Sequence, residues 1–175
     1  MNNGRPAQDA DATAPEPPDA LPPLWTCPRC QKQFVTPRMY HSCQVRTVDE
    51  HFAGRPRARV LFEAFRDAVE SMGPATLVLN KSGIGFMTRV RFCGVFPRRD
   101  FLRAGFWLKR RIESPRLVRT QYLGRDDWIY EFIVRDPADL DAEALAWLRE
   151  ARAVGDQEHL ARRERRKTGR LVPRS

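Results

Sequence analysis

The period of the apolar residues changes twice along this 175-residue chain, and the two changes restrict its fold. Over 58–72 apolar residues recur in steps of three and four, which predicts an amphipathic helix ended by Gly73 and Pro74. Short apolar or alternating runs over 76–135 predict five or six strands, and 142–154 returns to the helical period. This order indicates an α+β fold, a two-layer domain in which two helices cover one face of a mostly antiparallel sheet.

The alternation within the strands also predicts a positively charged surface, because the sheet face without helices is free to meet solvent or a partner. The cations expected at or beside this face are Lys81, Arg89, Arg91, Lys109 and Arg111. With an accessible Trp107 or Tyr122, such a surface could hold phosphates and stack bases. The alternative is a solvated face whose arginines form ion pairs with Glu113, Glu131 and Asp126.

The net charge supports an anionic partner. The chain has 31 Lys and Arg against 22 Asp and Glu, a formal net charge of +9. Residues 1–24 are acidic, so the excess lies in 25–155 and in the tail 156–175. The tail contains a dense basic run of Arg162, Arg163, Arg165, Arg166 and Lys167. These segments predict salt-sensitive phosphate contacts with nucleic acid, whereas the alternative is a charge that serves only solubility.

Four metal-ligating side chains occur close together near the N-terminus. They are Cys27, Cys30, His41 and Cys43, in the segment WTCPRCQKQFVTPRMYHSC. A C-x-x-C turn directs two thiolates at one ion, and His41 with Cys43 completes the Cys3His set that tetrahedral zinc takes. The H-x-C spacing is shorter than in the usual zinc finger and implies no recognition helix. His51 is a rival for the fourth ligand position if His41 points away.

Two other uses of these cysteines are open. A redox role for Cys27 and Cys30 is typical of a βαβ unit, which the pattern here does not predict, and the segment could also hold no metal. A closed Cys3His site has no free coordination position, so we expect a structural zinc ion rather than a catalytic one.

Composition divides the chain into four parts. Residues 1–23 are rich in Pro and acidic residues and predict a disordered leader. The zinc-finger-like module spans 24–48, the α+β domain 49–155 and the basic tail 156–175. No stretch approaches 18 uncharged apolar residues, and no basic region precedes an apolar run at the N-terminus, so we expect no membrane span, no signal peptide and a cytoplasmic protein.

The sequence contains no catalytic motif that would identify an enzyme: no G-x-S-x-G, no phosphate-binding glycine loop and no H-E-x-x-H. We therefore name no catalytic residue and expect a nonenzymatic, nucleic-acid-associated protein. One alternative is an adaptor that binds a protein partner through the module or the leader. The other is a small-anion or small-molecule domain, with Lys81, Arg89, Arg91 and His51 around a pocket.

Several short motifs together resemble a group of small bacterial proteins. These motifs are W-x-C-P-x-C, H-S-C, E-H-F-A-G, G-P, K-S-G-I-G-F and A-W-L-R-E-A, spread over about residues 25–160. The group joins a short zinc-finger-like segment to a domain of unknown function, and the resemblance implies a cytoplasmic bacterial protein without an assigned activity. The helix–sheet–helix order also resembles the frataxin-like layout of a family predicted to bind DNA, a likeness of architecture alone.

Overall fold

The structure is a computed structural model that describes residues 21–39, 41, 43 and 47–167, with the last five residues of this range described by their backbone alone. Six strands form one antiparallel sheet in the spatial order β3-β4-β5-β6-β8-β7. They are β3 (Thr76–Leu79), β4 (Ile84–Met87), β5 (Arg91–Pro97), β6 (Leu102–Leu108), β7 (Leu117–Gly124) and β8 (Asp127–Val134). All connections except that between β6 and β7 join spatial neighbours.

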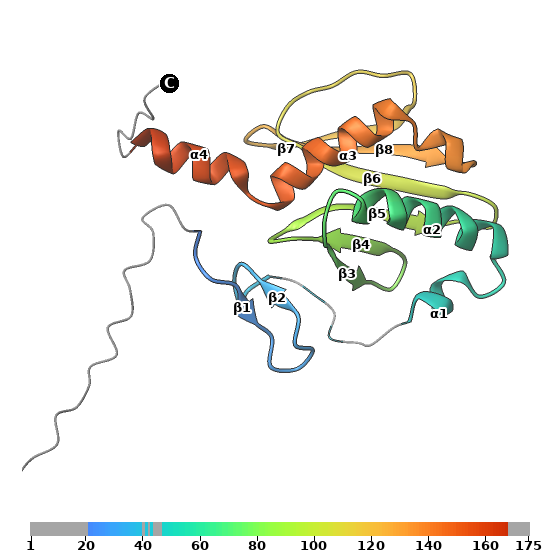
Figure 1. Cartoon of the computed structure of the whole chain (residues 1–175), viewed down its shortest axis with the longest axis horizontal. Helices are drawn as coiled ribbons and strands as arrows, with labels where there is room; N and C mark the ends of the chain where they lie inside the picture. The colour runs from blue at the N-terminus through green and yellow to red at the C-terminus, as the bar shows by residue number, and fades with distance from the viewer. Residues whose placement is uncertain (1–20, 40, 42, 44–46, 168–175) are drawn as a thin grey trace, which may run out of the picture.

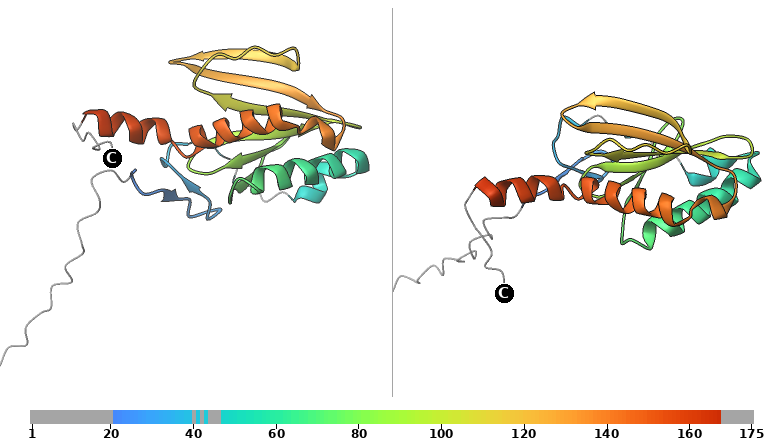
Figure 2. Two further views of the ribbon diagram at one scale, coloured as in Figure 1. Left: turned by 45° about the horizontal axis from the view of Figure 1, so that its top comes forward. Right: turned by 90° about the horizontal axis from the view of Figure 1, so that it is seen from above.

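Two long helices cover one face of this sheet, as Figures 1 and 2 show. They are α2 (Pro56–Glu70) and α3 (Ala142–Gly155). Phe62 and Phe65 of α2 and Leu148 of α3 are buried in the same core as Phe106 and Phe132 of the sheet. The predicted two-layer α+β fold with helices on one face is therefore confirmed.

Side-chain hydrogen bonds fix both ends of α3. The side chain of Asp141 caps α3 by accepting the N–H of Ala144 at 3.0 Å. Farther along α3, Arg152 donates to the carbonyls of Gly73 and Pro74, both at 2.9 Å, and so ties α3 to the segment after α2. Gly73 has φ of +120°, a conformation that favours glycine and lets the chain turn after the helix.

Shorter elements flank the main domain. β1 (Trp25–Thr26) and β2 (Gln33–Phe34) form a separate two-stranded sheet. α1 (Val48–Phe52), the 3-10 helix η1 (Pro137–Asp139) and α4 (Glu158–Lys167) complete the order. A capping box between Thr47 and Glu50 starts α1. No helix in the described part of the chain is both long and apolar enough to cross a membrane.

The run 83–97 is two strands of a hairpin rather than one alternating segment. β4 ends at Met87, β5 begins at Arg91, and the register shifts between Phe86 and Met87. Arg89 therefore lies in the connecting turn. Lys109 and Arg111 lie beyond the end of β6. Of Arg89, Arg91, Lys109 and Arg111, only Arg91 lies in a strand, because turns interrupt the alternation that predicted the positively charged face.

Candidate metal centre and open-face cavity

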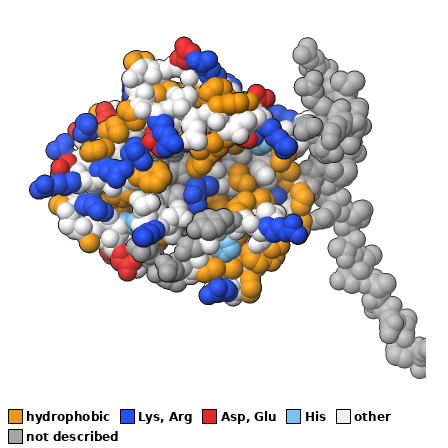
Figure 3. Space-filling model, turned by 180° about the vertical axis from the view of Figure 1, so that it is seen from behind, with side chains coloured by type: hydrophobic (Ala, Val, Ile, Leu, Met, Phe, Trp, Pro, Cys, Tyr) orange, Lys and Arg blue, Asp and Glu red, His pale blue; other side chains and the backbone are white. Residues whose placement is uncertain are grey.

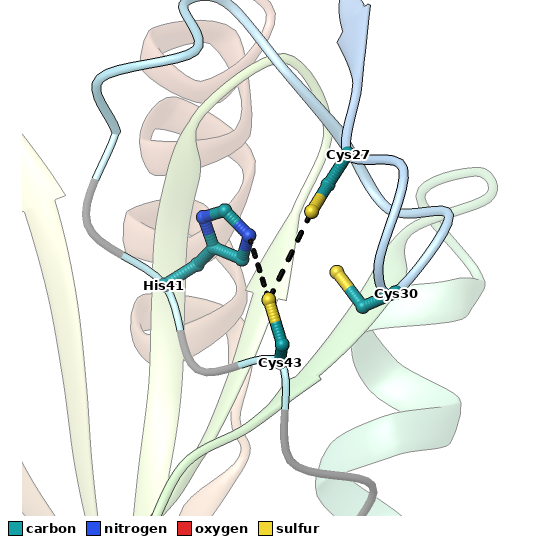
Figure 4. A group of neighbouring side chains, drawn as sticks. All are labelled: Cys27, Cys30, His41 and Cys43. Carbon is teal, nitrogen blue, oxygen red and sulfur yellow. Dashed lines mark hydrogen bonds between the residues drawn. The ribbon is translucent and has the colours of Figure 1, made fainter.

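A tight turn between β1 and β2 brings Cys27 and Cys30 together. The N–H of Cys27 donates to the carbonyl of Lys32 at 2.9 Å, and the N–H of Gln31 donates to the carbonyl of Cys27 at 2.8 Å. Gln31 has φ of +59°, which closes the turn. This geometry directs both thiols to the side from which the segment after β2 returns (Figure 4).

The returning segment adds His41 and Cys43, so all four predicted ligand residues converge (Figure 4). Their ligand atoms all lie within 4.8 Å of one another. The Sγ atoms of Cys27 and Cys43 are 3.8 Å apart, and the Sγ of Cys43 is 3.4 Å from Nε2 of His41. His51 lies in α1, outside this group, so His41 is its histidine.

These distances fit a tetrahedral ion better than a disulfide. A disulfide needs an S–S distance of about 2.05 Å, and all four cysteines are free. Zinc–sulfur bonds of about 2.3 Å and zinc–nitrogen bonds of about 2.0 Å place neighbouring ligand atoms about 3.8 Å (S–S) and 3.5 Å (S–N) apart in a tetrahedron. The Cys/His group therefore has the ligand types and spacing to hold a metal ion.

The electrostatics of the group favour a thiolate at Cys27. Burial opposes its ionisation, but hydrogen bonds from His41 and from neighbouring backbone N–H groups outweigh this and lower the pKa of the thiol to about 6. Burial and the adjacent thiols of Cys27 and Cys30 raise the pKa of Cys43. Ionising all three thiols at such short range requires a positive charge between them, which a bound metal ion supplies.

The orientation of His41 suits ligation through Nε2. Its Nδ1 lies 2.9 Å from the carbonyl of Met39 and carries a proton, so when Nε2 gives up its own proton the freed lone pair faces Cys43. The imidazole stacks on Phe34 with ring centroids 4.1 Å apart. Phe34 is buried and covers one side of the site.

The Cys/His module, defined as β1, β2, Met39 and the four ligand residues, is anchored on the main sheet. Cys27 and Phe34 of the module form one buried cluster with Val78 of β3 and Met87 of β4. Val78 and Met87 point away from the helices. The module therefore occupies one end of the open face, the face of the six-stranded sheet opposite α2 and α3.

One cross-strand row defines the middle of the open face. The paired residues along it are Val78, Gly85, Gly94, Gly105, Glu131 and Arg119, one from each strand. The three glycines, on the neighbouring strands β4, β5 and β6, lack side chains, so the row forms the floor of a cavity of about 980 Å³. Phe34 and Met39 of the module wall one end of it. Figure 3 shows a hollow on the side of the molecule turned away from α2 and α3.

The cavity carries an excess of positive charge. The charged residues that line it are Lys81, Arg91, Arg119 and Glu131. Glu131 is buried and lies between two arginines. Its Oε2 is 3.1 Å from Nε of Arg103, although the angle does not suit a hydrogen bond. Its Oε1 accepts a hydrogen bond from Arg119 at 3.3 Å. No acidic residue in the described part of the chain forms an ion pair with Arg91, whose pKa is lowered by burial.

The structure separates the other residues that were predicted to contact phosphates. Arg89 donates to Gln157 at 3.1 Å, Lys109 pairs with Asp127 at 2.6 Å, and Arg111 pairs with Glu113 at 2.9 Å. Arg162 pairs with Glu158 one turn earlier in α4. The side chains of Arg163, Arg165, Arg166 and Lys167 lie outside the described residues. Among the members of the predicted set whose side chains the structure describes, only Lys81 and Arg91 line the cavity.

Among the aromatic candidates, Trp107 lines the cavity, whereas Tyr122 does not and packs against Trp128 in a tilted pair with ring centroids 4.8 Å apart. Sequence reasoning missed Arg119 and the glycine floor. Arg119 could have been found from its alternation within 117–124, but the glycine row depends on the register of three strands.

Cys93 is fully buried in the main core, and burial raises the pKa of its thiol, so it is no nucleophile.

The fold and the site together define an α+β protein whose open sheet face carries a Cys/His module that could hold a metal ion. Comparison with protein families matches residues 48–152 to a domain of unknown function (DUF5655). The match covers more than half of the chain, which therefore belongs to the DUF5655 family. No curated protein and no solved structure matches the chain.

Proposed function

We propose that this protein is a zinc-containing, nonenzymatic protein that associates with nucleic acid. Zinc is the ion that a Cys3His set of this spacing prefers, and its four protein ligands leave no position for a substrate. The ion is therefore structural: it holds the Cys/His module closed on the sheet.

The observation that carries nucleic-acid association is the surplus cation of the open face. Lys81 and Arg91 line the cavity beside the already paired Glu131, so bringing a phosphate there needs no ion pair to be broken. An anionic ligand contributes more binding free energy at a half-buried guanidinium without an acidic partner than at a fully solvated guanidinium. The basic run of α4 adds charge that draws a polyanion toward the protein.

Fluorescence anisotropy of nuclease-treated, zinc-loaded protein against random-sequence DNA and RNA at two salt concentrations tests this proposal. We expect binding in the micromolar range or tighter that weakens steeply as salt rises. Arg91→Gln should weaken binding, whereas Arg99→Gln, which removes an exposed arginine outside the cavity, is the matched control. The absence of binding at low salt by folded, zinc-loaded protein would refute the proposal.

A second candidate function, a protein-interaction adaptor, is favoured by the edge strand β7. This strand exposes three large apolar residues: Val118 and Tyr122 are more than half exposed, and Leu123 is half exposed. An exposed sheet edge can accept a strand from another protein. Binding of a protein partner that survives high salt and nuclease treatment, and that Tyr122→Ser weakens, would favour this function over nucleic-acid association.

A further inference from the structure

We infer that the open-face cavity binds a single nucleoside phosphate unit, with its base over the glycine floor and its phosphate at Arg91 and Lys81. This inference rests on the proposed function and names the part of a nucleic acid that the cavity takes. The shared chemistry is a flat, polar-edged ring joined to a phosphate, and its source is either an unpaired nucleotide of a strand or a free nucleotide.

The floor of the cavity has the shape that a flat ring needs. Gly94 and Gly105 are paired across β5 and β6, and between them the backbone of the sheet is bare. Gly94 is required by its neighbours, because a Cβ there would lie 2.7 Å from the carbonyl oxygen of Ile84. Gly105 is not, because a Cβ there would meet only ordinary contacts at 3.6 Å and beyond. A glycine inside a strand that packing does not explain is typical of a place where another group approaches the backbone.

The walls supply the other contacts that a nucleotide uses. Trp107 lies beside the floor and offers a stacking surface, while Asn80, Ser82 and Gln121 offer hydrogen-bonding groups at the rim. The side chain of Arg91 lies across Gly85, where a Cβ would be 2.8 Å from its Nε. Gly85 therefore lets this guanidinium lie low at the edge of the floor, in reach of an anion bound there.

The cavity favours an unpaired nucleotide over a duplex. In a duplex the base faces are stacked on one another and only their edges are accessible, so no base can lie flat on the floor without being extruded. The Cys/His module closes one end of the cavity through Phe34 and Met39. The volume of about 980 Å³ suits a ligand of cofactor size, roughly one or two nucleotides, rather than a helical groove surface.

Gly105→Val provides the sharpest test, because it fills the floor without changing charge. The added Cβ has space, and valine suits a strand, so the variant should fold. The probes are a labelled oligothymidylate of about 12 nucleotides, its duplex with oligodeoxyadenylate, and AMP as a competitor. The control is Thr120→Val, which adds the same residue type to an exposed position of β7 outside the cavity.

We expect the single strand to bind at least ten-fold more tightly than the duplex, and AMP to compete for it. Gly105→Val and Arg91→Gln should each weaken binding of the single strand at least ten-fold, whereas Thr120→Val and Arg99→Gln should leave it within two-fold. Equal affinity for single strand and duplex, both unaffected by Gly105→Val, would overturn the inference and leave nucleic-acid association through other basic residues.

Failure of the proposed function has a different signature. One such outcome is that neither oligonucleotide binds, while calorimetry detects AMP binding that Gly105→Val abolishes. In that case the cavity takes a free nucleotide, and the proposal of nucleic-acid association is wrong. If no oligonucleotide and no AMP binds to folded, zinc-loaded protein, both the proposed function and the inference are wrong.

Discussion

At the scale of single residues, His41 links the candidate metal centre to Phe34 at the edge of the cavity. Its Nε2 faces Cys43, its Nδ1 faces the Met39 carbonyl, and its ring stacks on Phe34, which walls the cavity. A change at this residue therefore affects both the ligand set and a packed surface. These two effects can be separated, because a second thiolate can replace the imidazole as a ligand but not as a stacking partner.

His41→Ala should abolish stable metal retention, whereas His41→Cys should preserve it. Alanine leaves three ligands and should lower zinc affinity by more than the 10–100-fold typical of changes outside the ligand set, while cysteine restores four ligands. Zinc content after dialysis against a moderate chelator measures the difference. His51→Ala is the control for the loss of a histidine elsewhere in the chain. If His41→Ala retained as much zinc as the unmodified protein, the assignment of His41 as a metal ligand would be contradicted.

Two neighbouring glycines should respond in opposite ways to the same substitution. Gly94→Ala places a Cβ against the backbone of β4, so it should lower the free energy of unfolding by about 1–3 kcal/mol through strand displacement. Gly105→Ala meets no close contact, so it should leave the free energy of unfolding unchanged or raise it by less than about 1 kcal/mol, because alanine restricts the unfolded chain. Urea titrations of both variants measure this. Equal destabilisation would show that the floor at Gly105 is closed by packing.

At the scale of elements, helix α3 depends on its first turn. The Asp141 carboxylate accepts the N–H of Ala144 and pairs with Arg116 at 2.7 Å. The hydrogen bond and then the guanidinium lower the pKa of Asp141. A carboxyl with a lowered pKa in the folded state contributes stability that is complete above its pKa in the unfolded chain and is lost as pH falls through its folded pKa.

Asp141→Ala should therefore lower the Tm at neutral pH, and the difference from the unmodified protein should shrink in acid. The difference disappears once the pH is below the lowered folded pKa, where the native carboxyl is itself protonated. Thermal unfolding followed by circular dichroism from pH 7 downward measures the trend. Asp67→Ala, which removes an exposed carboxylate of α2, is the control for the loss of a negative charge elsewhere. A Tm difference for Asp141→Ala that does not change with pH would contradict this role.

The elements also show which parts of the fold the sequence could predict. The regular apolar steps of α2 and α3 depend on neighbouring residues only, so their helices and buried faces could be predicted, as could the common face of Trp128, Tyr130, Phe132 and Val134. The turn after Met87 and the bulge beside it interrupt the alternation, so the placement of Arg89 in a strand failed. The Cys/His group was predictable from spacing. The cavity was not, because three glycines face one another only after the strands have paired.

At the scale of the whole molecule, two hydrophobic clusters share one sheet. The main core lies between the sheet and the helices and contains no residue of the Cys/His module. The second cluster lies on the open face and joins Cys27 and Phe34 to Val78 and Met87. The two strands of the module are each only two residues long, so we expect its structure to depend on a bound metal ion.

Removing the metal should therefore open the cavity while leaving the main domain folded. Without the ion, Phe34 and Met39 lose their anchor, Val78 and Met87 become exposed, and one wall of the cavity is lost. Hydrogen–deuterium exchange should increase in 25–43 and 76–87 after chelation, with α3 and β8 unchanged, and affinity for the oligothymidylate should fall. Cys43→Ser should reproduce this pattern, and Cys93→Ala, which removes a thiol from the main core, should not. A uniform increase in exchange along the chain would instead show that the ion stabilises the whole protein.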